Sequence, residues 1–154
     1  MTNSTTSLAI ISLAGGVGRT TLAGELATLA ARAGHGSLAV DWDPQNLLAL
    51  HFGLEHPPAE GLAANAANGE PWQGSALRNA DGAVLLPFGR LTLPQLRDWY
   101  PQMARERGWL AERLAQIDRP APRSGRHWTF IDTPRAPSLL TEQAMLAADA
   151  VLLV

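Results

Sequence analysis

The stretch LAGGVGRTT, residues 13–21, contains the strongest structural signal in the chain. Its glycines Gly15, Gly16 and Gly18 allow the backbone to curl so that consecutive N–H groups point at one anion. A helix is expected to follow directly, and its positive end would add to that attraction. The segment therefore predicts a phosphate-binding loop, although Arg19 stands where such loops usually carry a lysine.

The composition places this loop in a soluble globular chain that has no lysine. All 12 basic residues are arginine, so the arginine at position 19 follows the bias of the whole sequence. The net charge of −2 gives no general electrostatic reason to bind nucleic acid. Its 154 residues are enough for one domain, and no run of 18 apolar residues predicts a transmembrane helix. The absence of cysteine excludes disulfides and thiolate metal sites and fits a reducing cytoplasm.

Strand and helix patterns alternate on both sides of the loop. Residues 7–13 form an apolar run of strand length, and residues 20–33 carry leucine and alanine at helical spacing. A second apolar strand covers residues 37–40 and ends at Asp41-Trp42-Asp43. Continuous apolar strands joined by a helix are typical of parallel sheets covered on both faces.

The remaining pattern extends this α/β arrangement. It predicts short helices over 47–52 and 61–68 and a strand over 76–87 with a turn at 81–82. A helix over 101–117 and a loop over 120–126 are expected to follow. The last predicted elements are a strand over 127–132, a helix over 138–147 capped by Ser138, and a strand from 150. We expect one α/β domain over residues 1–154, with a mostly parallel sheet and helices on both faces. Because the chain ends within an apolar strand, we expect it to be the N-terminal portion of a longer domain or a shortened version of one.

Chemically useful side chains follow three of the predicted strands. Thr20 is placed to ligate a phosphate-bound Mg²⁺ through its hydroxyl. Asp41 and Asp43 follow the second strand, where a carboxylate can hold or orient water, and Asp132 ends an apolar strand in a Walker B pattern. Taken singly, the glycine loop could be a tight turn and each aspartate could cap a helix or lie in solvent. Together, in this order, they predict a P-loop NTPase fold with a site for a nucleotide and Mg²⁺.

Three motifs also resemble those of a known group of nucleotide-binding proteins. GGVGRTT (15–21), DWDPQN (41–46) and IDTPR (131–135) match in order and spacing the motifs of the deviant-Walker ATPases that include ParA and MinD. Within that group the chain is most similar to the bacterial cellulose biosynthesis family BcsQ, also called YhjQ. The supporting segments are DPQNLLALHFGLE (43–55), LLPFG (85–89) and HWTFIDTPRAPS (127–138).

The resemblance implies a function and a set of partners. Such proteins are nucleotide-dependent dimers that assist the inner-membrane cellulose synthase complex and do not make the polymer themselves. A member would be cytoplasmic and would reach the inner membrane through its partners.

The resemblance also implies roles for individual residues. Asp43 matches the aspartate that positions the attacking water, and Asp41 and Asp132 match aspartates near the metal, which Thr20 ligates. The nucleotide-binding positions are Gly15, Gly16, Val17, Gly18, Arg19, Thr20 and Thr21. Ala14 replaces the signature lysine that reaches the partner subunit's nucleotide. Because arginine meets phosphate differently from lysine, and hydrolysis needs accurate positioning, we expect binding to be retained and turnover to be slow or absent.

Two other functions remain open at this point. One is a ParA-like partition or positioning ATPase that moves on DNA. The acidic net charge argues against it, and a solvated loop explains the local basic cluster of Arg119, Arg123 and Arg126 more simply. The other is a degenerate scaffold that binds no nucleotide, against which the intact Thr20, Asp43 and Asp132 argue.

Overall fold

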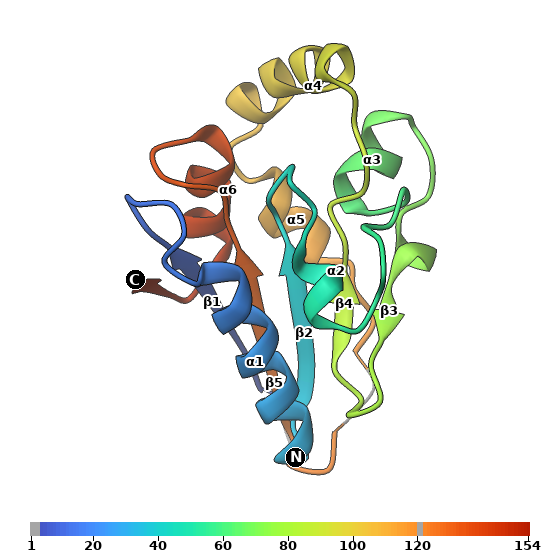
Figure 1. Ribbon diagram of the computed structural model, residues 1–154, viewed down its shortest axis with the longest axis vertical. Helices are drawn as coiled ribbons and strands as arrows, with labels where there is room; N and C mark the ends of the chain where they lie inside the picture. Colours follow the sequence, from blue (N-terminus) through green and yellow to red (C-terminus); the bar gives the residue numbers. More distant parts are fainter. Residues whose placement is uncertain (1–3, 120–121) are drawn as a thin grey trace.

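A single six-stranded sheet forms the centre of the computed structural model, which describes residues 4–119 and 122–154 (Figure 1). The strand order is β3-β4-β2-β5-β1-β6. All neighbouring pairs are parallel except β3 and β4, which form an antiparallel hairpin. The strands are β1 (Ser4–Ile11), β2 (Gly36–Asp41), β3 (Leu77–Arg78), β4 (Val84–Leu86), β5 (Arg126–Asp132) and β6 (Ala150–Leu153). The predicted α/β class and mostly parallel sheet are confirmed.

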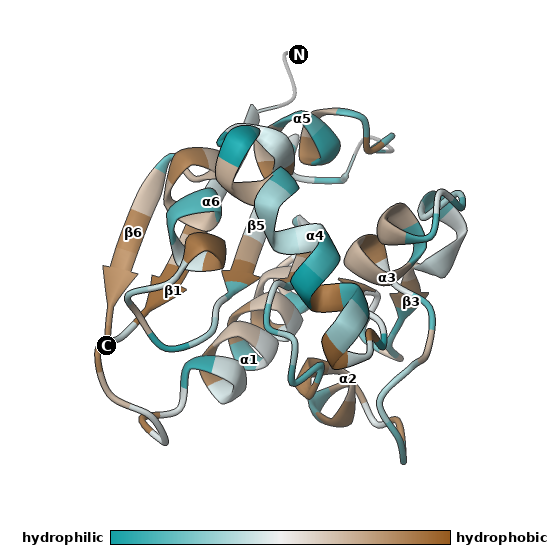
Figure 2. Ribbon diagram, turned by 90° about the horizontal axis from the view of Figure 1, so that it is seen from above, coloured by the Kyte–Doolittle hydropathy of each residue, from teal (hydrophilic) through white to brown (hydrophobic). Residues whose placement is uncertain are grey.

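Helices cover both faces of the sheet, as predicted. The helices are α1 (Arg19–Arg32), α2 (Leu48–His51), α3 (Leu62–Ala67), α4 (Leu93–Arg105), α5 (Trp109–Ala115) and α6 (Leu139–Ala147), with a 3₁₀ turn at Gln73–Ser75. Buried residues of α1 and α2 pack against one face, and those of α3 to α6 pack against the other. Figure 2 shows this separation from above, with α1 and α2 on one side of the strands and α5 and α6 on the opposite side. Among the described residues, no helix combines the length and apolar character needed to cross a membrane.

The two faces are packed with side chains of very different size. On the α1 side the contacts are made largely by small residues, including Ala23, Ala27 and Ala39. On the other side, Trp42, Phe88, Trp99 and Trp109 form an aromatic cluster, with ring centroids of neighbouring members 5.6–5.8 Å apart. Trp42 is fully buried, and its indole Nε1 donates a hydrogen bond to the carbonyl of Leu140 at 2.9 Å.

One helix prediction is wrong. The helix expected over 101–117 is replaced by α4 and α5, which are separated at Gly108. A capping box between Thr92 and Gln95 starts α4 well before Pro101, which lies inside that helix. The apolar residues Met103, Leu110 and Leu114 are buried, as their spacing predicts, but they belong to two helices.

Two smaller expectations were met or partly met. The Ser138 side chain accepts a hydrogen bond from the Thr141 N–H, so it caps α6 as predicted. Residues 120–121 of the predicted loop lie outside the described residues, residues 122–125 form a turn, and Arg126 already belongs to β5.

Candidate functional site

Three loops converge at the carboxyl ends of neighbouring strands. In the sheet, β5 lies between β2 and β1, and Asp132 is in register with both Asp41 and Ile10. The segments that follow β1, β2 and β5 therefore leave the sheet side by side. Ligands of open α/β sheets bind in the crevice formed by such strand ends.

The loop after β1 has the backbone of an anion-binding turn. Gly16 has a φ of 68° and Gly18 a φ of 90°, in the left-handed region that glycine enters without strain. Gly18 is the N-cap of the 14-residue helix α1, and no side chain caps that end. The first N–H groups of α1 are therefore left to a ligand or to water.

Arg19 folds back over this loop. Its Nη1 donates to the carbonyl oxygen of Ala14 at 2.9 Å and to the hydroxyl of Ser12, which in turn donates to the same carbonyl. Its Nε is buried and has no hydrogen-bond partner in the described structure. The guanidinium is thus held from one side by the loop, while a second N–H group is unsatisfied.

Thr20 and Asp132 are joined directly, although they lie 112 residues apart. The Thr20 hydroxyl donates to Asp132 Oδ2 at 2.7 Å. The Asp132 carboxyl is 1% exposed, and its second oxygen, Oδ1, has no partner within the described residues. Burial raises the pKa of Asp132 to about 6, while the Thr20 hydrogen bond opposes that rise. A buried carboxylate oxygen without a partner beside a hydroxyl is suited to a hard cation such as Mg²⁺.

Asp41 is fully buried and is occupied by the backbone of its own loop. Its Oδ2 accepts the Leu48 N–H at 2.9 Å, and its Oδ1 accepts the Asp43 N–H at 3.2 Å. Burial, followed by the charge of Asp132, raises its pKa well above the ordinary value. In this structure Asp41 shapes the loop after β2 and the start of α2, and its placement near the metal stays a prediction.

Asp43 is half-buried and lies close to the other site residues. Its Oδ1 accepts the Gln45 N–H at 2.9 Å. Burial raises its pKa, and the nearby charge of Arg19 opposes the rise. The carboxylate borders an open hollow of about 510 Å³ whose walls include Tyr100 and Ser138. No residue of the glycine loop lines this hollow, so it offers Asp43 contact with water on the side of Tyr100 and Ser138.

The structure brings most of the predicted site residues together. Arg19, Thr20, Asp43 and Asp132 form one group beside the glycine loop, since Thr20 is hydrogen-bonded to Asp132 and the charges of Asp43 and Arg19 both act on the pKa of Asp132. Val17 and Thr21 are exposed, and their contacts with nucleotide stay predictions. In residues 4–119 and 122–154 no three His, Cys, Asp or Glu side chains are arranged to hold a metal ion by themselves, so a metal here would need hydroxyl or phosphate ligands as well.

Two residues that matter for the site were missed from the sequence. Ser12 holds Arg19, and its position at the end of β1 was the available signal. Trp42 lies between the two aspartates, and its burial in the aromatic cluster anchors the loop that carries Asp43.

Comparison with known proteins identifies the family. Residues 5–154 match the sequence profile of the family described as "Cellulose biosynthesis protein BcsQ". The chain belongs to the BcsQ family. The BcsQ protein of Escherichia coli strain K12 is 33% identical over 139 residues, which are 88% of this chain and 52% of that protein. This BcsQ-family chain thus spans about half the length of the curated relatives it matches.

Solved structures agree with the P-loop fold. The cobyrinic acid a,c-diamide synthase of Mycobacterium smegmatis, solved with a bound ATP analog and magnesium, has a TM-score of 0.79 at 25% identity. The septum site-determining protein MinD of Pyrococcus horikoshii, complexed with Mg-ADP, has a TM-score of 0.73 at 22% identity. Each alignment covers 97% of this chain and 57% of the other. The ParA/MinD-like P-loop fold expected from the sequence is confirmed.

Proposed function

We propose that this BcsQ-family chain acts as an ATP-binding switch that assists cellulose biosynthesis and hydrolyses ATP slowly or not at all. The proposal rests mainly on the hydrogen bond between Thr20 and Asp132 beside the glycine loop. The family match supports the link with cellulose biosynthesis. ATP and Mg²⁺ are supported by the related structures that contain an ATP analog or ADP with magnesium.

Phosphate binding would depend on the backbone and on Arg19. The uncapped start of α1 offers N–H groups whatever side chains surround them. The unpaired Nε of Arg19 offers one further charged donor. Since Ser12 and Ala14 already hold Nη1, the guanidinium is oriented before nucleotide arrives, which limits the entropy lost on binding.

Thr20 and Asp132 would hold the metal. Mg²⁺ usually binds through one or two carboxylates, several waters and the phosphates of the substrate. Asp132 Oδ1 is the unsatisfied buried oxygen at this point, and the Thr20 hydroxyl is next to it. When bound, the ion would neutralise part of the phosphate charge.

Hydrolysis would depend on Asp43, whose carboxylate would orient the attacking water. Its partial burial raises its pKa, while the open hollow beside it leaves it in reach of water. The planar guanidinium of Arg19 cannot copy the position of a lysine ammonium at the transferring phosphate. Since phosphoryl transfer relies on positioning, the arginine is expected to reduce the rate more than the affinity.

The proposed assembly is a nucleotide-dependent homodimer that works with the inner-membrane cellulose synthase complex and its accessory proteins from the cytoplasmic side. Ala14 lacks the side chain that would reach the partner subunit's nucleotide, so the dimer should be weaker than in lysine-bearing relatives. Arg135, which follows β5, is the alternative side chain for this contact. A DNA-moving role is less favoured, because the chain carries 14 acidic and 12 basic residues.

Nucleotide binding and turnover can be separated on the same proteins. Titration with a fluorescent ATP analogue measures affinity, and a phosphate-release assay measures turnover. Arg19→Ala should weaken binding by roughly 1.5–3 kcal/mol, the usual value of one charge-assisted hydrogen bond. Arg97→Ala is the matched control, since Arg97 is an exposed arginine on α4. Absence of saturable binding by the unmodified protein at millimolar nucleotide would favour the scaffold function instead.

Three further variants assign the remaining roles. Thr20→Ala should remove the dependence of binding on Mg²⁺. Asp43→Ala should leave affinity nearly unchanged and abolish any hydrolysis. Arg19→Lys should raise turnover without tightening binding, and an unchanged or lower rate would show that the arginine is not the cause of slow hydrolysis.

A further inference from the structure

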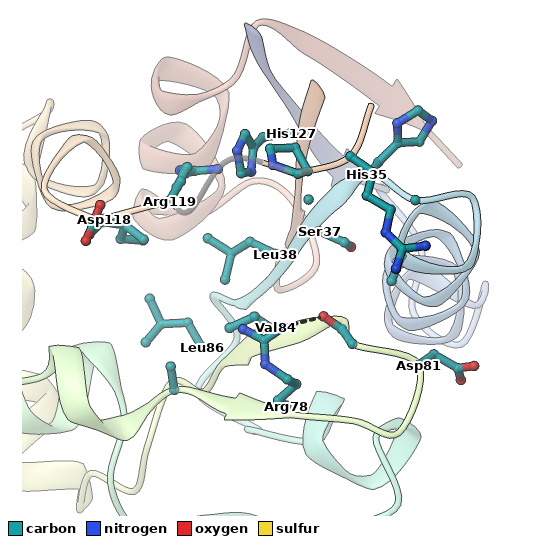
Figure 3. A pocket seen from close by; sticks show the side chains of 18 of the residues that line it. His35, Ser37, Leu38, Arg78, Asp81, Val84, Leu86, Asp118, Arg119 and His127 are labelled. Carbon is teal, nitrogen blue, oxygen red and sulfur yellow. Dashed lines mark hydrogen bonds between the residues drawn. The ribbon is translucent and has the colours of Figure 1, made fainter. Parts of the chain in front are cut away.

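A second cavity lies at the opposite end of the sheet. It is about 680 Å³ and is formed at the amino ends of β2 and β5, whereas the glycine loop follows the carboxyl end of β1 (Figure 3). The two sites are therefore separated by the length of the strands. Pockets for small molecules usually measure about 300–1,000 Å³, so the volume suits a small ligand.

The floor of this cavity is apolar. Leu38 of β2 and Val84 of β4 are register partners, and Leu86 lies farther along β4. Trp72, which is buried, also lines the cavity. A ligand would thus find a hydrocarbon surface built on two neighbouring strands.

One polar group at the cavity is buried without a partner. His127 is only 6% exposed, and its Nε2 makes no hydrogen bond within the described residues. Its register partner is Gly36, where an added Cβ would come within 2.1 Å of the imidazole Nδ1. Glycine at this position therefore allows the ring to lie against the backbone of β2. A buried polar nitrogen without a partner destabilises the fold, and a ligand that donates to it or accepts from it would remove that cost.

Arg119 adds a positive charge on the same wall. Figure 3 shows Arg119 and His127 together, on the far side of the cavity from Arg78. The Arg119 Nη1 donates to the Thr129 hydroxyl at 2.7 Å, and among the described residues no carboxylate forms an ion pair with it. Burial, and then the charge of Arg119, lower the pKa of His127. The guanidinium is thus oriented but not neutralised.

The other charged groups leave an excess of positive charge. The cavity is lined by four arginines and two aspartates, and one of those aspartates, Asp81, is already paired with Arg32 at 2.9 Å. Asp118, which Figure 3 shows next to Arg119, is exposed, so four arginines still outnumber two aspartates. An anionic group is therefore favoured at the wall that carries Arg119.

We propose that this cavity binds a small amphipathic anion, with its apolar body on Leu38, Val84 and Leu86 and its carboxylate or phosphate group against Arg119 and His127. Such a ligand would satisfy the buried imidazole nitrogen and the unpaired guanidinium at once. The site is independent of the nucleotide loop and does not rest on the proposed ATP switch.

NMR titration of the 154-residue chain with 2-naphthoate tests the proposal. The imidazole signal of His127, assigned by its loss in His127→Gln, and the indole signal of Trp72 should both shift and saturate. Neutral 2-naphthamide should bind at least ten-fold more weakly. Equal binding of the amide, or an unmoved His127 signal, would overturn the proposal. Comparison of 2-naphthoate with 2-naphthyl phosphate shows which anionic group the wall prefers.

Variants locate the binding. Arg119→Gln should weaken 2-naphthoate at least ten-fold, and Val84→Phe should abolish binding by filling the floor. Arg97→Gln is the matched control and should change nothing. Because Arg119→Gln also removes a contact to Thr129, the Val84→Phe result is required independently. Unchanged affinity in a folded Val84→Phe protein would place the ligand elsewhere and refute the site. Displacement of 2-naphthoate by Mg–ATP without any shift at His127 would refute it as well.

Discussion

The two faces of the sheet differ in the size of the side chains that pack their helices. On one face, Ala23, Gly24 and Ala27 of α1 are buried, and α1 lies so close to α2 that an added Cβ at Gly24 would be 3.1 Å from His51 Cβ. On the other face, Trp42, Trp99 and Trp109 fill a thick aromatic layer under α4 and α5. The small-residue face thus permits close approach, and the aromatic face provides a large buried area.

Each face positions a different half of the nucleotide site. Close packing of α1 brings Thr20 to Asp132 on the neighbouring strand. The aromatic layer buries Trp42 and thereby anchors the loop that carries Asp43. The geometry of the site would therefore depend on the packing of both faces. Variants of the α1 face should affect Thr20, and variants of the aromatic face should affect Asp43.

The largest effect is expected where the aromatic layer is broken. Trp42→Ala removes a fully buried indole, its contacts with three aromatic rings and its hydrogen bond to Leu140. The free energy of unfolding should fall by about 3–5 kcal/mol, the usual cost of such a truncation. Urea denaturation followed by circular dichroism measures it. Trp42→Phe should cost clearly less, and equal losses would mean that ring packing is not what stabilises this face.

A change at the junction of the two faces should stabilise the protein. The pKa of Asp132 is raised from the ordinary 3.8 to about 6, so the folded state retains a proton that the unfolded state loses as the pH rises from about 4 to 6. The free energy of unfolding therefore falls across that window, and Asp132→Asn should recover up to about 3 kcal/mol at pH 7.5.

Thermal unfolding between pH 4 and 8 measures this effect in the absence of nucleotide and Mg²⁺. Part of the pH dependence should persist in the variant, because the pKa of Asp41 is also raised by burial. If Asp132→Asn is less stable than the unmodified protein at pH 7.5, burial of the charged Asp132 carboxylate does not destabilise the fold.

Overfilling the small-residue face should have an intermediate effect. Ala27→Leu inserts three carbons where α1 meets the sheet, which should destabilise the protein by about 1–3 kcal/mol. It should also displace Thr20 from Asp132 and weaken the Mg²⁺ dependence of nucleotide binding. Glu25→Leu, on the exposed side of α1, is the control and should leave both properties unchanged. A neutral Ala27→Leu variant would show that this face is not tightly packed.

The smallest effect is expected outside both layers. Arg32 and Asp81 form an ion pair at 2.9 Å, but the side chains are 62% and 33% exposed. Exposed pairs contribute little, because water screens the charges and the side chains lose entropy. Arg32→Ala should therefore leave the melting temperature unchanged within the error of calorimetry. A clear loss of stability would mean that the β3–β4 hairpin depends on this contact with α1.

The succession of strands and helices along the chain, and most residues of the candidate site, could be predicted from the sequence. Apolar runs and glycine positions are local signals, and they located β1, α1, β2 and β5 to within a few residues. Thr20, Asp43 and Asp132 were predicted from the phosphate-loop, first-switch and Walker B motifs, and the carboxyl ends of parallel strands then bring them together in the fold. The split of residues 101–117 into two helices was missed, because a continuous apolar spacing does not reveal a break at Gly108.

The glycine loop is a property of local sequence, since positive φ angles at Gly16 and Gly18 depend on the absence of a side chain at those residues. The contact of Arg19 with Ser12, the bond between Thr20 and Asp132, and the imidazole of His127 against Gly36 come from the folded arrangement. The last two join residues 112 and 91 positions apart along the chain and require β5 to lie between β1 and β2. Hydrophobic periodicity shows which side of a strand is buried, but it carries no information on which strand is its neighbour. The order of the strands in the sheet is decided only when both faces are packed at once, with small residues on one side and aromatic rings on the other.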